Sequence, residues 1–86
     1  MFNIIERYIN RMSTEDIRNF ATKKNIDLSD NELTFTYNFV KKNYKSVLGN
    51  PKLFDINRYK NNYSPENFQK ISKLWDEYSK KYSNYL

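Results

Sequence analysis

Side chains that could perform catalysis are sparse in this 86-residue sequence. It contains no cysteine and no histidine, which excludes thiolate chemistry, cysteine-ligated zinc and a histidine general base near neutral pH. A single glycine excludes a glycine-rich phosphate loop. Ser13, Ser29 and Ser64 have no base nearby in the sequence, and each stands where it can cap a helix. We therefore predict that the protein is not an enzyme and has no catalytic residue, cofactor or metal.

Two groups of carboxylates are close enough in the sequence to be considered as chemical sites. Asp27, Asp30 and Glu32 lie close together, but a cation site needs more oxygen ligands and usually a glycine bend, so helix capping is the favoured role. Asp76 and Glu77 are neighbours on an expected helix, where adjacent side chains diverge. They make a poor acid and base pair.

Basic side chains gather between residues 41 and 60, against Asp55 as the sole acid: Lys41, Lys42, Lys45, Lys52, Arg58 and Lys60. Aromatic residues are interleaved with them, which suits nucleic-acid binding through phosphate contacts and base stacking. The other interpretation is a solvated lysine face over aromatic core residues. We favour the second, because lysine dominates over arginine and no recognised nucleic-acid motif is present. The net charge of +5 also fits a genome rich in A/T codons.

The stretch Leu28–Leu48 carries two periodicities. Alternation favours a half-buried strand with Leu33, Phe35, Tyr37 and Phe39 on one face. A spacing of about 100° per residue instead favours a helix. The apolar face of this expected helix consists of Leu33, Tyr37, Val40, Tyr44, Val47 and Leu48. Ser29 and Glu32 fit a capping box, Gly49 fits a left-handed C′ stop, and no hairpin partner is evident, so we predict a helix.

The helical interpretation leaves Phe35 and Phe39 as i,i+4 neighbours on the side opposite Leu33. A helix that is apolar on two sides is either wrapped by other helices or offers its second face to a partner. Phe35 and Phe39 are therefore our candidate residues for binding a protein partner.

Two further helices are expected before the central one. The first spans Phe2–Met12, with the apolar stripe Phe2, Ile5, Tyr8, Ile9 and Met12. The second follows the N-cap Ser13, and its buried edge is Ile17, Phe20 and Ala21. Asn25 suits the left-handed C′ position, which places Ile26 to fold back on this edge.

Two starts are open after Gly49: a short helix beginning at Pro51, or one capped by Asp55. The anchors are the same in both cases: Leu53, Phe54, Ile56 and Tyr59. Ser64-Pro65-Glu66 then begins a last helix that runs to about Tyr82. Its stripe is Phe68, Ile71, Trp75, Tyr78, Tyr82 and Tyr85. This seam is short for a coiled coil, so packing within the domain is favoured over a homodimer.

Three segments resemble those of a family of short, uncharacterised all-helical proteins of Bacillus-like bacteria, a domain-of-unknown-function family. They are MSTEDIRNFATKKNIDLSDNE, the Phe54-Asp55 step before a basic segment, and SPENFQKISKLW. The resemblance covers most of the chain and rests on capping patterns, and the segment between Asp55 and Ser64 is shorter here. It implies an all-helical fold in a bacterial protein, and it carries over no activity.

Together these patterns predict a single all-α domain over residues 1–86, a bundle of four helices with a short fifth element at Leu53–Asn61. No apolar run approaches the roughly 20 residues of a membrane span, and Met1–Met12 has no signal-peptide core. We expect a small basic cytoplasmic protein without membrane contact, a monomer or weak homodimer. The leading function is an adaptor-type protein-interaction module, and the alternative is nucleic-acid binding through residues 41–60.

Overall fold

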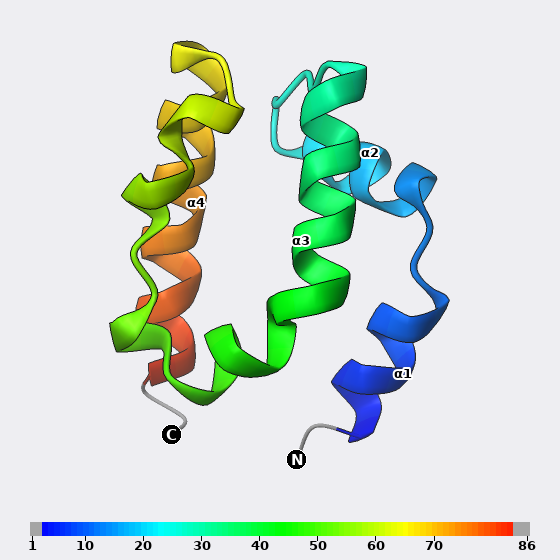
Figure 1. Cartoon of the computed structure of the whole chain (residues 1–86), viewed down its shortest axis with the longest axis vertical. Helices are drawn as coiled ribbons and strands as arrows, with labels where there is room; N and C mark the ends of the chain where they lie inside the picture. The colour runs from blue at the N-terminus through cyan, green and yellow to red at the C-terminus, as the bar shows by residue number, and fades with distance from the viewer. Residues whose placement is uncertain (1–2, 84–86) are drawn as a thin grey trace. The chain divides into compact units, whose positions relative to one another are not determined.

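The structure, a computed structural model, describes residues 3–83, with side chains described for residues 4–81. Within that range there are helices and no strand (Figure 1): α1 (Asn3–Arg11), α2 (Thr14–Lys23), α3 (Asp30–Gly49), the 3-10 helices η1 (Pro51–Leu53) and η2 (Ile56–Asn62), and α4 (Pro65–Ser83). The all-α prediction is confirmed, and the alternating stretch around Phe35 is helical. Three residues of the predicted stripes fall outside the described side chains: Phe2, Tyr82 and Tyr85.

The chain divides into two compact units, Met1–Lys45 and Ser46–Leu86. The first contains α1, α2 and most of α3, and the second contains the last turn of α3, both 3-10 helices and α4. None of the helices within residues 3–83 is long and apolar enough to cross a membrane.

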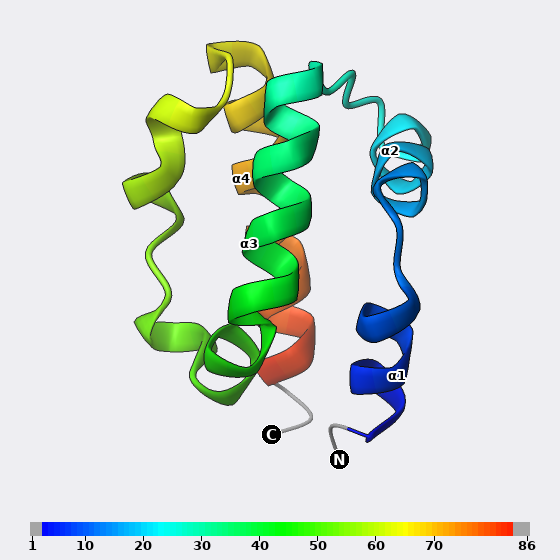
Figure 2. The ribbon, with the colours of Figure 1, turned by 45° about the vertical axis from the view of Figure 1, so that its right-hand side comes forward.

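In the first unit, α1 and α2 lie on one side of α3 (Figures 1 and 2). The buried apolar side chains of the described residues all belong to this unit: Ile9, Ile17, Ala21, Ile26, Leu28 and Leu33. Each of the larger ones contributes about 1.5–3 kcal/mol relative to an exposed position. This core decides which faces of α1, α2 and α3 are turned inward.

The turn after α2 follows the predicted chemistry. Asn25 has a φ of 62°, in the left-handed region that asparagine tolerates better than most residues. Ile26 N donates to the Ala21 carbonyl at 2.8 Å, and Asn25 N donates to the Thr22 carbonyl at 3.0 Å. These are the two hydrogen bonds of a Schellman motif. Ile26 is only 3% exposed, so the prediction that it folds back on α2 is confirmed.

Two predicted core residues of this unit are wrong. Phe20 is 46% exposed, because Ile17 and Ala21 face the core and Phe20 stands about 100° around the helix from Ala21. Lys24 Nζ lies 5.8 Å from its ring centroid. Tyr8 is 66% exposed for the same reason, since it shares the outer side of α1 with Ile4 while Ile9 is buried.

In the second unit, η1 and η2 pack along α4. Both starts left open by the sequence are used. Pro51 is the first residue of η1, and the Asp55 carboxylate accepts a hydrogen bond from Asn57 N at 3.0 Å at the start of η2. The predicted start of α4 is confirmed, with Ser64 Oγ accepting from Asn67 N at 3.1 Å and Pro65 as the first helical residue.

Aromatic rings pack the 3-10 helices against α4. The Phe54 ring meets Trp75 edge to face at 5.0 Å and stacks on Tyr59 at 5.8 Å. Leu53, predicted as a further anchor, is instead 80% exposed, because Phe54 supplies the contact with α4. Gly49 is also corrected. It has no positive φ and forms the last residue of α3, so it does not stop the helix in a left-handed conformation.

Candidate partner-binding surface

The first turn of α3 is held by the predicted capping box. Ser29 Oγ accepts a hydrogen bond from Glu32 N at 3.2 Å, and the Glu32 carboxylate accepts one from Ser29 N at 2.8 Å. Glu32 is only 6% exposed, so this carboxylate is committed to the helix start. Arg18 adds a brace from α2, donating to the Leu28 carbonyl at 3.2 Å and pairing with Asp30 at 3.1 Å. These contacts connect the start of α3 to α2.

Phe35 and Phe39 follow on the side of α3 away from Leu33. They stand about 200° and 240° around the helix from Leu33 at 100° per residue, which is the face opposite the core. Their rings stack on each other with centroids 6.1 Å apart and planes inclined by 27°. Both side chains are half-buried, whereas Leu33 is 8% exposed. The structure therefore brings the two candidate residues together as one aromatic pair and leaves part of it accessible to solvent.

Two of the candidate nucleic-acid-binding lysines are engaged within the first unit. Lys41 Nζ donates to the Asn10 carbonyl at 3.0 Å, at the C-terminal end of α1, and lies 5.3 Å from the Tyr37 ring centroid. A cation at a helix C-terminus satisfies an orphan carbonyl and complements the helix dipole. Lys45 Nζ pairs with Glu6 at 3.3 Å and lies 5.9 Å from the Tyr44 ring centroid. These two lysines of α3 therefore form polar contacts with α1.

The remaining candidate cations are exposed and belong to different elements. Lys42 is on α3, Lys52 is on η1, and Arg58 and Lys60 are on η2. Two of the aromatic rings interleaved with them, Phe54 and Tyr59, are engaged in packing and are not free to stack on bases. Phe54 and Tyr59 stack on each other, and Phe54 contacts Trp75. The structure thus uses these rings for packing within the second unit, which is the interpretation we favoured from the sequence.

Two carboxylates in the first turn of α3 have structural partners. Asp30 pairs with Arg18, and Glu32 closes the capping box. Within the described residues, no three acidic side chains come together in a way that could hold a metal ion. Asp76 on α4 pairs with Lys80 one turn later, at 3.2 Å, in the i,i+4 arrangement that its spacing predicts.

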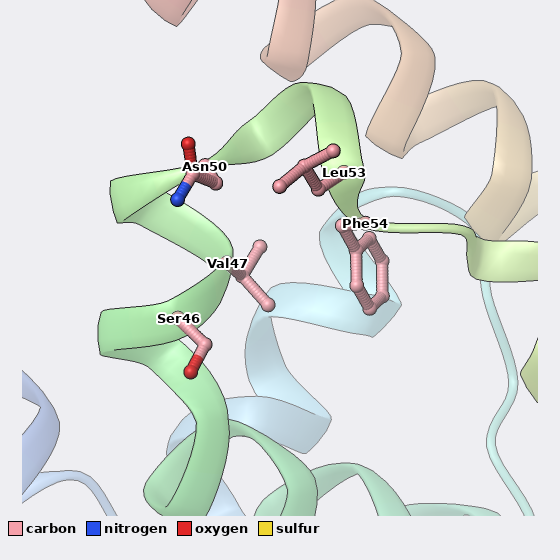
Figure 3. Close-up of a pocket in the computed structure, with 5 residues that line it drawn as sticks. All are labelled: Ser46, Val47, Asn50, Leu53 and Phe54. Atoms are coloured by element: carbon pink, nitrogen blue, oxygen red, sulfur yellow. The ribbon is translucent and has the colours of Figure 1, made fainter.

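A small hollow of about 300 Å³ lies where α3 ends and η1 begins (Figure 3). Val47, Leu53 and Phe54 face this space, and Ser46 and Asn50 line it from α3 and the following residue. The exposed Leu53 accounts for its apolar character. Sequence reasoning treated Leu53 as an internal anchor and so missed this hollow.

The contacts made by Arg18 and Lys41 were also missed. They join residues 10 to 31 positions apart, and no local pattern in a single sequence indicates which carbonyl a long basic side chain will reach. The i,i+4 spacing of Ile4 and Tyr8 predicts that they are neighbours on α1, but it does not indicate that this side of the helix is exposed.

No protein-family model, curated protein or solved structure matches this chain. The resemblance to short helical proteins of Bacillus-like bacteria stays a prediction.

Proposed function

We propose that this chain is a non-enzymatic, cytoplasmic protein-interaction module that binds a protein partner through Phe35 and Phe39 of α3. One observation carries the proposal. The two rings form a stacked pair on the side of α3 opposite the buried Leu33, and both are half-buried only. The fully buried apolar side chains of the first unit are other residues, and the ring pair is not among them.

The energy available from this pair suits an interaction site. A phenylalanine side chain buries roughly 150–250 Å² when it is fully covered, and at most about a third of Phe35 and of Phe39 is still exposed, so covering the remainder removes at most about 50–80 Å² per ring from water. At about 25 cal/mol per Å² this contributes at most about 1–2 kcal/mol for each ring. Aromatic side chains of this kind dominate the centres of protein interfaces, where a few residues carry most of the affinity.

The helix is also well prepared to present these rings. The Ser29 and Glu32 capping box fixes the helix start one turn earlier. Lys41 and Lys45 tie the following turns to α1. Rings held on a braced helix lose little conformational freedom on binding, and this preserves affinity.

The proposal is tested by affinity capture from the source cell with the wild-type chain, Phe39→Ala and Phe20→Ala as baits. Phe20 is the matched control, because it is a partly exposed phenylalanine on another helix of the same unit. We expect one or more proteins to be enriched with wild type and Phe20→Ala, and to be depleted at least tenfold with Phe39→Ala. That loss corresponds to about 1.4 kcal/mol or more. Circular dichroism of each bait verifies its helicity.

Identical protein sets for the three baits, or equal loss with Phe20→Ala and Phe39→Ala, would contradict the proposal. The first result would mean that the ring pair binds nothing, and the second that general unfolding or loss of any exposed ring explains the depletion. A captured partner is then purified and titrated against the same three chains by calorimetry, where Phe39→Ala must weaken the affinity and Phe20→Ala must leave it unchanged.

The alternative from the sequence, nucleic-acid binding, now depends on four exposed cations: Lys42, Lys52, Arg58 and Lys60. Phosphate contacts make affinity fall steeply with salt. Anisotropy of a labelled single-stranded oligonucleotide, measured at two salt concentrations with wild type and Arg58→Ala, tests it. Salt-sensitive binding at micromolar protein that weakens in Arg58→Ala would favour this alternative, and absence of such binding ends it.

A further inference from the structure

A second surface of this chain lies in the unit formed by residues 46–86. A groove of about 610 Å³ runs between η2 and one face of α4. Its apolar floor is made by Ile56, Pro65, Phe68 and Trp75. Phe68 and Trp75 are half-buried, so each is partly accessible from the groove. The volume lies within the range of natural binding pockets, about 300–1,000 Å³.

The shape of the groove favours a linear occupant. Along α4 its lining recurs at Pro65, Phe68, Ser72 and Asp76, which is one face of the helix over three turns. At 1.5 Å per residue this distance is about 16 Å. An extended segment of about five residues has the same length at 3.3 Å per residue. A peptide laid along α4 therefore fits the groove from end to end.

The charge of the rim selects the kind of peptide. Lys60 on η2 and Lys73 on α4 line the groove, and both are exposed. Among the described residues, neither ammonium group has a hydrogen bond or an ion pair. The one acid of the lining, Asp76, is already paired with Lys80 at 3.2 Å. The unpaired charge around this groove is thus positive on both of its walls.

From the apolar floor and the two lysines we propose that this groove binds an acidic linear peptide of a protein partner, with a large apolar side chain over Phe68 and Trp75 and carboxylates on Lys60 and Lys73. Charge complementarity of this kind steers association and fixes the register of the bound segment. Gln69 and Ser72 supply hydrogen-bonding groups for its backbone. This site does not depend on Phe35 and Phe39, which belong to the other unit.

The test uses a fluorescein-labelled synthetic peptide in which glutamates and aspartates surround a central Phe-Leu pair. A second peptide carries lysine at every acidic position. Anisotropy reports binding to the full chain, and the emission of Trp75 reports its location, since Trp75 is the single tryptophan of the sequence. We expect saturable binding of the acidic peptide with a change in Trp75 emission, and no binding of the basic peptide.

Charge reversal locates the site. Lys73→Glu should weaken binding at least fivefold, because it removes one favourable charge and adds a repulsive one. Lys52→Glu is the matched control, since Lys52 is an exposed lysine of the same unit that does not line the groove. It should change the affinity less than twofold. Circular dichroism verifies that both variants remain helical, and raised salt should weaken wild-type binding.

Three results would overturn the proposal. The first is absence of binding by the acidic peptide up to millimolar concentration. The second is equal weakening by Lys52→Glu and Lys73→Glu, which would indicate a general charge effect. The third is tighter binding of a single-stranded oligonucleotide with the same dependence on Lys73, which would make the groove a nucleic-acid site. Each of these results leaves the test of Phe35 and Phe39 unaffected.

Discussion

Replacing Glu32 with alanine tests how the start of α3 is held. The Glu32 carboxylate accepts a hydrogen bond from Ser29 N at 2.8 Å and is only 6% exposed. The chain contains a natural control, because Asp16 closes a second capping box with Ser13 N at 2.9 Å but is exposed to solvent. The two boxes share their hydrogen bonds and differ in burial. Comparing the two alanine variants therefore isolates the contribution of burial.

The structure sets the magnitude. Glu32→Ala removes one of the two hydrogen bonds of the capping box, a loss of about 1–1.5 kcal/mol, and one buried methylene group, about 0.8 kcal/mol. The total is a loss of about 2 kcal/mol in the free energy of unfolding. Asp16→Ala removes an exposed hydrogen bond, and water can then accept the hydrogen bond from Ser13 N. We therefore expect a loss of about 0.5–1 kcal/mol. The difference between the two variants is about 1 kcal/mol.

Urea unfolding followed by far-ultraviolet circular dichroism is the appropriate assay. Tryptophan emission is unsuitable, because Trp75 belongs to the second unit and Glu32 to the first. With a slope of about 1–3 kcal/mol per molar urea, the unfolding midpoint of Glu32→Ala should lie about 0.3–1 M below that of Asp16→Ala. Equal midpoints for the two variants, or an unchanged midpoint in Glu32→Ala, would refute the argument that burial strengthens this box.

Three further predictions concern stability and use the same urea assay. Gly49→Ala should raise the free energy of unfolding by about 0.5 kcal/mol, because Gly49 is helical and its added Cβ would meet no atom within 4 Å. A loss of stability would instead show that the left-handed stop predicted from the sequence is correct. Asn25→Ala should lower stability by about 1 kcal/mol while Asn25→Gly changes it by less than about 0.5 kcal/mol, because Asn25 has a φ of 62°; equal effects would argue against that backbone conformation. Lys41→Met should lower the free energy of unfolding by about 0.5–1 kcal/mol, because it removes the hydrogen bond to the Asn10 carbonyl. Lys42→Met, at the next residue, which is exposed, should leave the free energy of unfolding unchanged. A larger effect at Lys42 would contradict the role given to Lys41.

Local chemistry was the part of the structure that the sequence could predict. The caps at Ser13, Ser29 and Ser64 and the left-handed Asn25 are all present. Each depends on residues within five positions of one another, so the hydrogen-bond geometry follows from spacing alone. The choice of helix for the central stretch rested on the same signals, and it is correct although Leu33, Phe35, Tyr37 and Phe39 alternate as in a strand.

Side-chain burial was harder to predict, and the errors share one cause. Tyr8, Phe20 and Leu53 are large apolar residues at the edge of a helical stripe. Periodicity places such a residue within about 60° of the core, and only tertiary packing decides on which side of the boundary it falls. At Gly49 the residue type suggested a stop, but α3 continues through it without a positive φ.

For the candidate site, the ring pair could be predicted from the sequence, but the contacts that hold α3 against α1 could not. The i,i+4 spacing of Phe35 and Phe39 predicts that they meet, and their centroids lie 6.1 Å apart. The six basic residues between 41 and 60 were treated as one group, whereas Lys41 and Lys45 contact α1 through partners more than 30 residues away. Composition cannot distinguish a lysine that braces a helix from one that is free to bind a ligand.

The most direct test of the central claim places a photoreactive benzoylphenylalanine at position 39 and, as a control, at position 20. Irradiation in the lysate of the source cell should give a discrete crosslinked protein band from position 39, and this band should disappear when unlabelled wild-type chain is added in excess. Unlabelled Phe35→Ala chain should fail to remove the band. The same label at Phe20 should give no such band. A band of equal intensity from positions 20 and 39, or none from position 39, would contradict the assignment of Phe35 and Phe39 as the partner-binding surface.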